Sequence, residues 1–384
     1  MKKFLTTAFL AVFGAFVLGS AKAEISLSGY QEFYMGSADQ STQNAISTNS
    51  GASTNSNFNG FSNGRFTRLI AVATTTLDSG IEVTGTYTLS KDGDDGGDAD
   101  TSAVAVDQND IVFSGGFGTI AFGQNFSAGS RMHFRGTTLV PTAEIDNDQT
   151  FRFITGGDAA RGYGRYDEAG YALDGMKLVY LSNVYEGFSF GVSYEPCMVH
   201  NSSNASATDC NSTTAPSEHG TYTDLTDIVL RYQADFDGIG FGVTYGYTTG
   251  NTNIIANVEY NDLENTTLSA QLTYGGLTLI ARNNNLEDSG QIKTNTDDGG
   301  EEGDTYAIRY DMGNMSLGYT ITETEKGVTG QSTPNSGKYT VLGAGYNLGG
   351  GVNIETAYIT IEQKEGGTVD TDADMILTKL SFGF

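Results

Sequence analysis

The sequence predicts an all-β fold, a transmembrane barrel of sixteen antiparallel strands behind a cleaved N-terminal segment. Three observations lead to this prediction. Apolar residues recur at every second position over most of the chain, short and long connections alternate between the resulting strands, and the last strand ends on an aromatic residue, Phe384. Period-two alternation with tight turns at one end and long loops at the other is typical of barrels in bacterial outer membranes.

The first 23 residues have the three parts of a secretory signal peptide. Lys2 and Lys3 form a positive start, residues 4–18 are apolar and uncharged, and residues 21–23 (AKA) form a small-x-small cleavage site. We therefore expect residues 1–23 to be removed and residues 24–384 to form one exported barrel. A retained N-terminal anchor is the alternative, but the apolar stretch is short for a membrane span.

Composition and charge restrict the class of partner. The chain carries 46 Asp and Glu against 20 Lys and Arg, a net charge of −26. Because phosphate binding needs clustered Lys and Arg, this balance argues against nucleic acid as a partner. No stretch after the signal is apolar for long enough to form a membrane helix. A mature chain that crosses a membrane must therefore do so with strands.

Each predicted strand has one apolar face and one polar or small-residue face. Phe188 and Phe190, for example, alternate with Ser189 and Gly191. The sixteen strands are predicted near 24–36, 64–77, 80–90, 109–116, 118–124, 171–182, 187–194, 226–236, 239–248, 265–275, 276–285, 304–312, 314–324, 338–348, 351–362 and 373–384. Short turns such as 237–238 and 275–276 alternate with long polar loops such as 37–63 and 195–225. A soluble β-sandwich shares the period but has no reason to place every long loop at one end.

Three motifs add a family resemblance that covers Glu24 to Phe384. Residues 111–124 read IVFSGGFGTIAFGQ, residues 187–194 read GFSFGVSY, and residues 66–69 read FTRL. They resemble strands of the general, non-specific porins of Gram-negative bacteria, of the alphaproteobacterial kind. The resemblance implies a third external loop, here from residue 125 to about 170, that folds inward and narrows the pore.

The same resemblance implies a function and partners. We expect a passive diffusion channel for ions and small hydrophilic solutes, not an enzyme, integral to the outer membrane as a homotrimer. It would contact lipid and lipopolysaccharide and would be inserted by the barrel assembly machinery through Phe384. An adhesin or surface receptor that acts through its loops is the alternative. An enzyme needs a nucleophile and a base in reach of each other, and the three His of the chain, at 133, 200 and 219, fall in predicted loops.

The sequence departs from the family pattern at two positions near the root of this loop. The family often has basic residues where this chain has Asp110 and Gln124. The constriction loop also lacks the Pro-Glu-Phe-Gly-Gly-Asp element of some members and reads PTAEIDND over 141–148. Pore width and selectivity therefore do not carry over from the resemblance.

Alternation assigns the charged residues of the strands to the interior, because a charge facing lipid at the midplane would cost roughly 2–4 kcal/mol. The predicted interior charges are Glu82, Lys177, Arg231, Arg282, Arg309, Glu355 and Lys379. The resemblance places Arg68 inside as well. By the same resemblance, the acids of the inward loop (Glu144, Asp146 and Asp148) face basic wall residues (Arg68, Lys177 and Lys379) across the pore. Arg131, His133 and Arg135, early in this loop, either line the constriction or brace the loop.

Two further groups lie in external loops. Cys197 and Cys210 are close in sequence, so we expect a local disulfide in an oxidising compartment. The acids Asp92, Asp94, Asp95, Asp98 and Asp100 offer oxygen ligands to Ca²⁺, although a solvated acidic turn is the simpler interpretation. Acids in the 91–108 and 286–303 loops also predict a cation preference at the external mouth that weakens at high salt.

Overall fold

The computed structural model describes residues 23–42, 58–92, 105–141, 175–199, 220–255, 257–294, 300–327, 333–366 and 368–384. These residues form strands and one short helix. In chain order they are β1 (Glu24–Thr42), β2 (Phe58–Thr76), β3 (Glu82–Asp92), β4 (Ala105–Gly115), β5 (Gly118–Gln124), α2 (Ala128–Met132), β6 (Met176–Leu181), β7 (Phe188–Val199), β8 (Gly220–Phe236), β9 (Ile239–Asn251), β10 (Leu263–Tyr274), β11 (Leu277–Glu287), β12 (Glu301–Met312), β13 (Met315–Lys326), β14 (Asn335–Gly349), β15 (Val352–Glu365) and β16 (Thr368–Gly383).

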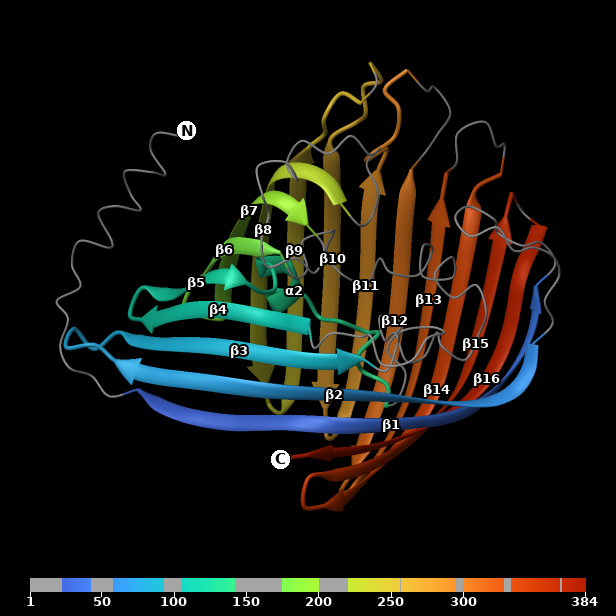
Figure 1. Ribbon diagram of the computed structural model, residues 1–384, viewed down its shortest axis with the longest axis horizontal. Helices are drawn as coiled ribbons and strands as arrows, with labels where there is room; N and C mark the ends of the chain where they lie inside the picture. Colours follow the sequence, from blue (N-terminus) through green and yellow to red (C-terminus); the bar gives the residue numbers. More distant parts are fainter. Residues whose placement is uncertain are drawn as a thin grey trace.

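The sixteen strands close into one antiparallel barrel, as the sequence predicts. Each strand pairs with its neighbours in the chain, and β1 pairs with both β2 and β16. The last residue joins the ring, because Phe384 and Gly29 exchange two backbone hydrogen bonds of 3.0 Å. Figure 1 shows the strands side by side around the barrel, with α2 inside it. Closure leaves no sheet edge open along the paired strands.

One end of the barrel carries the start of β1, the C-terminal residue Phe384 and the short turns, and we call it the turn end. Its connections are 77–81, 116–117, 182–187, 237–238, 275–276, 313–314 and 350–351. At 237–238 both residues have positive φ, 55° and 81°. Two positive φ values are what a type I′ hairpin turn requires. The opposite end, which we call the loop end, carries most of the long connections.

The strict alternation of short and long connections is wrong at one place. β15 and β16 are joined at the loop end by residues 366–367 alone, because β16 starts at Thr368 rather than near 373. Gln363 pairs with Thr371 and Glu362 with Asp372, so the acidic run before Met375 belongs to the strand. Asp372 and Asp374 are exposed on the outer face, where they extend the strand beyond its apolar part.

The two faces of the barrel differ as alternation predicts. Large apolar side chains such as Phe33, Phe190, Ile308 and Tyr358 are 42–54 % exposed on the outside. The inside carries many buried Thr, Ser and Asn side chains, chiefly on β9–β14, and a buried apolar cluster on β1 and β14–β16. This pattern is the reverse of a water-soluble protein and is the pattern of a membrane barrel. In the described parts of the chain, no helix is long and apolar enough to cross a membrane.

Candidate functional site inside the barrel

The residues that follow β5 enter the barrel and run along its inner wall. We call residues 125–141 the inner segment. Its backbone meets the strands in chain order: Ala128 N donates to Ser193 Oγ of β7 at 3.2 Å, and Phe134 N donates to Ser269 Oγ of β10 at 3.0 Å. Further along, Thr320 Oγ1 of β13 donates to the carbonyl oxygen of Gly136 at 3.0 Å. The inner segment therefore crosses the wall from β7 to β13.

Three apolar contacts fix the inner segment at intervals. Ala128 packs on Ala121 and Val179 of β5 and β6. Phe134 packs on inward side chains of β11 and β12, and Val140 packs on a cluster formed by β1 and β14–β16. Each of these loop side chains is at most 6 % exposed. Since burial of apolar area stabilises contact, these anchors hold the inner segment against the wall.

The start of α2 is fixed by a wall carboxylate. Gly129 N donates to Asp227 Oδ2 at 2.5 Å, and Thr248 Oγ1 donates to Asp227 Oδ1 at 3.2 Å. Ser127 is the N-cap, and its Oγ accepts from Ser130 N at 3.2 Å. Because helix N-termini present unpaired N–H groups, a buried carboxylate from β8 satisfies the end of this short helix. Asp227 is 2 % exposed and binds the loop rather than facing the channel.

Lys177 of β6 closes the root of the inner segment. Its Nζ donates to the carbonyl oxygens of Asn125 and Gly175, at 2.8 and 3.0 Å, and lies 3.2 Å from Glu195 Oε2 of β7. The Lys177 side chain is fully enclosed. Lys177 faces inward as alternation predicts, but its ammonium group connects the residue after β5 to the residue before β6. A solute in the channel does not reach this buried charge, so its role is to position the ends of the loop.

The departure at Asp110 has a structural explanation. Asp110 of β4 is 3 % exposed and faces the interior, where its Oδ2 lies 3.7 Å from Arg131 Nη2 and accepts from Gln108 Nε2 at 3.1 Å. Arg131 Nε also donates to the Phe126 carbonyl oxygen at 3.1 Å. In this pair the acid lies on the wall and the base on the loop, the reverse of the arrangement that the resemblance implies for the constriction. Of the two roles predicted for Arg131, its contacts support bracing.

His133 is buried beneath the inner segment. Its Nδ1 lies 2.6 Å from Thr244 Oγ1 of β9. Burial, together with the nearby Arg282 and Arg231 guanidinium groups, lowers the pKa of the His133 imidazole to about 3. The imidazole is therefore neutral at ordinary pH. Burial is the main reason why the charged form is disfavoured, and repulsion from the two arginines adds to it.

Two wall arginines bind backbone carbonyl oxygens of the inner segment. Arg231 Nη1 donates to Met132 O at 3.3 Å, and the Arg231 guanidinium lies 4.5 Å from the centre of the Phe134 ring. Arg309 Nη1 donates to Leu139 O at 3.2 Å, and its Nε donates to Asp311 Oδ1 at 3.0 Å. Both face inward as predicted. Their contacts indicate that they hold the loop from the wall.

Inward glycines make room for the inner segment. A Cβ at Gly242 of β9 would collide with the Phe134 ring, and a Cβ at Gly343 of β14 would lie 2.6 Å from Val140 Cγ1. Neither glycine has positive φ. Close approach, rather than backbone conformation, is thus the reason for glycine at these positions.

The inner wall formed by β2, β3 and the turn-end halves of β1 and β16 is different, and we call it the open wall. Its inward side chains Arg68, Val72, Thr84 and Thr86 are all partly exposed. Arg68 lies 5.2 Å from the Phe66 ring centre and 5.8 Å from that of Tyr30.

Two carboxylates surround Lys379 on the same wall. Its Nζ lies 2.7 Å from Glu355 Oε2 and 3.6 Å from Glu32 Oε1, and the Lys379 side chain is 17 % exposed. Glu82 lies on the same face of β3 as Thr84, near the turn end, and is exposed. Arg68 and Lys379 therefore face the interior, as the sequence predicts, and their role as wall bases of the pore stays a prediction.

Several predicted site residues lie outside the described parts of the chain. They are the loop acids Glu144, Asp146 and Asp148, the acids Asp94, Asp95, Asp98 and Asp100, and Cys210. Asp92 ends β3, and Arg135 is half-buried in the inner segment. The roles predicted for these residues stay predictions. Cys197 is buried and disulfide-bonded, and its predicted pairing with Cys210 stays a prediction. No group of three metal-ligand side chains occurs among the residues described.

Sequence reasoning missed the wall groups that bind the loop. Asp227, Glu195, Thr244 and Ser269 all lie on the polar face of an alternating strand, so alternation could have placed them inside. Alternation does not show that a polar inward side chain binds a loop residue far away in sequence. The inward glycines Gly242 and Gly343 were the stronger signal, because a missing side chain on a wall marks a close approach.

Comparison with known proteins gives a family and a fold. The family described as Gram-negative porin matches residues 6–366. No curated protein matches the chain. The structure is similar to an anion-selective porin from Comamonas acidovorans, with a TM-score of 0.65 and 13 % identity over 94 % of this chain and 100 % of that one.

Two further solved structures share the fold. OmpF of Salmonella typhi, in complex with daunomycin, aligns with a TM-score of 0.61 and 14 % identity over 92 % of this chain and 97 % of that one. The trimer form of OmpT, an outer membrane protein of Vibrio cholerae, aligns with a TM-score of 0.56 and 12 % identity, over 94 % of this chain and 99 % of that one.

Proposed function

The chain belongs to the Gram-negative porin family and is an integral outer-membrane protein, and from this premise we propose that it is a passive diffusion channel for ions and small hydrophilic solutes, constricted by the connection between β5 and β6. The observation that carries the proposal is the course of the inner segment, which stays on the inner wall from β7 to β13 through buried hydrogen bonds. A connection held inside the barrel reduces the open cross-section without closing it.

The asymmetry of the interior supports a route for the solute. On the loop-bearing side, Lys177, Asp227 and Arg282 are buried, and Arg309 binds the inner segment while 32 % of its side chain stays exposed. On the open wall, Arg68 and the Lys379 cluster remain partly exposed. Polar and charged side chains along a water-filled lumen favour hydrophilic solutes over apolar ones. Transport down a gradient needs no catalytic group, so we assign no enzymatic activity.

We also propose that the channel is a homotrimer that resides in the outer membrane with its turn end toward the periplasm. Short periplasmic turns and longer external loops are the rule for such barrels. A trimer form of the similar Vibrio cholerae protein supports the oligomeric state. Unboiled gel samples should show a heat-modifiable band near three times the mature mass, whereas a monomer by light scattering in mild detergent would contradict it.

Conductance in a planar lipid bilayer tests the channel directly. Purified protein should give stable, ohmic steps of uniform size, and neutral hydrophilic polymers above a size limit should not reduce them. Insertion without conductance would contradict the channel and would favour the adhesin or surface receptor, which acts through its loops. The same recordings made in a salt gradient give the ion preference.

A further inference from the structure

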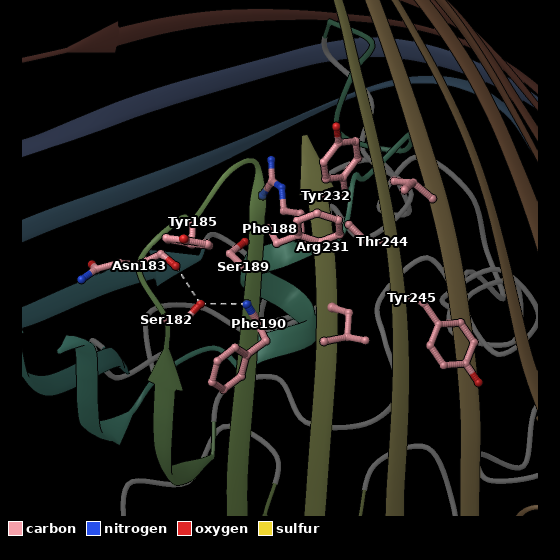
Figure 2. Close-up of a pocket in the computed structure, with 12 residues that line it drawn as sticks. Ser182, Asn183, Tyr185, Phe188, Ser189, Phe190, Arg231, Tyr232, Thr244 and Tyr245 are labelled. Atoms are coloured by element: carbon pink, nitrogen blue, oxygen red, sulfur yellow. Dashed lines mark hydrogen bonds between the residues drawn. The ribbon is translucent and has the colours of Figure 1, made fainter. Parts of the chain in front are cut away.

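A hollow on the outer face of the barrel lies close to the turn end. Its volume is about 420 Å³, and it opens between side chains of β7, β8 and β9. Figure 2 shows Phe188, Phe190, Tyr232 and Tyr245 around it. The volume falls within the range of about 300–1,000 Å³ that is usual for small-molecule sites. We call this hollow the aromatic notch.

Short side chains between large ones create the aromatic notch. Tyr232 pairs across the sheet with Val243, and Val243 pairs with Ala270 of β10. The row above pairs Leu230 with Tyr245. Val243, beside the larger Leu230 and Tyr245, leaves a depression that a flexible apolar chain can fill. On the same face Phe188 packs on Tyr232 with ring centres 4.6 Å apart, which holds one side of the depression in place.

The turn beside the notch is well ordered by its own hydrogen bonds. Phe190 N donates to Ser182 Oγ at 2.8 Å, and Asn183 Nδ2 donates to the carbonyl oxygen of Gly116 at 2.9 Å. Beyond these bonds, Val184 and Tyr185 project from the turn and are 68 % and 75 % exposed. An exposed aromatic at a membrane–water boundary typically lies at headgroup level. The notch thus has an apolar floor in the bilayer and an edge at the interface.

Charge near the notch selects the headgroup. The adjacent turns carry the acids Glu186 and Asp237, and Asp235 near the end of β8 accepts from Gly238 N of the second turn. Within 182–190 and 230–245, all of which the structure describes, the one basic residue is Arg231. It lines the notch, but its guanidinium group binds Met132 O inside the barrel. An anionic headgroup at this edge would meet like charge, whereas an ammonium group would meet opposite charge.

We propose that the aromatic notch binds one acyl chain of a periplasmic-leaflet phospholipid with an ethanolamine headgroup. The lipid-facing position of an integral outer-membrane protein supplies the apolar chain, and the acidic turns supply the preference for the ammonium group. This inference goes beyond the channel function and does not depend on it. Failure of conductance would leave it standing.

The absence of Trp from the sequence makes the test direct. Tyr245→Trp places a single Trp in the notch, and Tyr306→Trp is the matched control, since Tyr306 is an outer-face Tyr of β12 with nearly the same exposure, 52 % against 51 %. Each variant is reconstituted in vesicles with brominated phosphatidylethanolamine or brominated phosphatidylglycerol. The ratio of the two quenching constants is compared between positions, so that the depth of each Trp cancels.

We expect the ethanolamine lipid to be favoured about threefold at position 245 relative to position 306. Val243→Phe, which fills the notch, should remove that preference. Equal ratios at both positions, a preference for the glycerol headgroup, or a ratio unchanged by Val243→Phe would overturn the proposal. Quenching by neither lipid at position 245 would show that a protein surface covers the notch, and would overturn it too. If Tyr245→Trp does not fold, Leu230→Trp gives the same readout.

Discussion

The loop-bearing wall from β7 to β13 and the open wall on β2, β3 and the turn-end halves of β1 and β16 carry the same kinds of charged residues but use them differently. On the loop-bearing wall, Arg231 and Arg309 bind carbonyl oxygens of the inner segment and Asp227 binds the start of α2. On the open wall, Arg68 stacks on two aromatic rings and keeps part of its surface exposed. Charges beneath the inner segment therefore hold it in place, and Arg309 does so while 32 % of its side chain stays exposed. Charges on the open wall face the interior without the inner segment over them.

This difference predicts that mutations on the two walls have different readouts. Changes on the loop-bearing wall should alter stability and the behaviour of the loop. Changes on the open wall should alter ion preference with little effect on folding.

Lys177→Met should have the largest effect on stability. It leaves Glu195 buried without its cation, and breaking a buried ion pair from one side costs about 3–5 kcal/mol. We expect a clear fall in the temperature at which the folded band is lost on unboiled gels. Lys338→Met is the matched control, because Lys338 pairs with Glu323 at 2.7 Å on the exposed outer face. An exposed pair of this kind contributes about 0–1 kcal/mol. Equal losses for the two variants would contradict the bracing role of Lys177.

Gly343→Val should displace the end of the inner segment. The added side chain meets Val140 and the Pro141 carbonyl oxygen, and overpacking of this kind costs about 1–3 kcal/mol. Single-channel records should show more frequent closures or added noise. Gly85→Val is the control, since nothing lies within 4 Å of a Cβ there. Unaltered records for Gly343→Val would mean that this contact does not hold the loop.

Acid should loosen the inner segment through His133. The pKa of this imidazole is about 3 in the folded protein against 6.5 in the free side chain. When the inner segment is detached from the wall, His133 is exposed and binds a proton at a higher pH than when the segment is attached. The contribution of His133 to the attachment is therefore fully present above pH 6.5 and is lost as the pH falls toward 3. Channel noise should rise between pH 6.5 and 5, before most carboxylates titrate. His133→Asn should be insensitive to pH in this interval; a wild-type channel just as insensitive there would count against the account.

Arg68→Ala should have the smallest effect on stability and a visible effect on selectivity. Cation–π contacts of this kind contribute about 0.5–1 kcal/mol. The acidic external mouth already predicts a modest cation preference at low salt, and removal of Arg68 should increase it. Reversal potentials in a KCl gradient measure the change. Arg65→Ala is the control, because Arg65 lies on β2 like Arg68 but on the outer face, opposite Phe33 of β1. It should leave the potential unchanged.

The alternation of apolar and polar residues predicted the fold. The sequence did not show which residues far apart in the chain contact each other. Alternation placed Arg231, Arg282 and Arg309 inside, and the turn at 237–238 was predicted from its residues. Alternation failed to predict the start of β16, because Asp372 and Asp374 are typical of a loop although they face outward from a strand. It also could not pair Asp110 with Arg131, because strand period fixes the face of a residue but not its partner.

Thiol accessibility of the two walls tests the central claim most directly. Arg68→Cys lies on the open wall, and Ser269→Cys lies on the loop-bearing wall beneath the inner segment, where Ser269 is 1 % exposed. A bulky, charged methanethiosulfonate reagent added during bilayer recording should lower the conductance of the Arg68→Cys channel in steps and leave the Ser269→Cys channel unmodified. Equal reaction at both positions would show that the inner segment does not shield the loop-bearing wall. Reaction at Ser269→Cys alone would show that solute does not pass along the open wall, and either result would contradict the account.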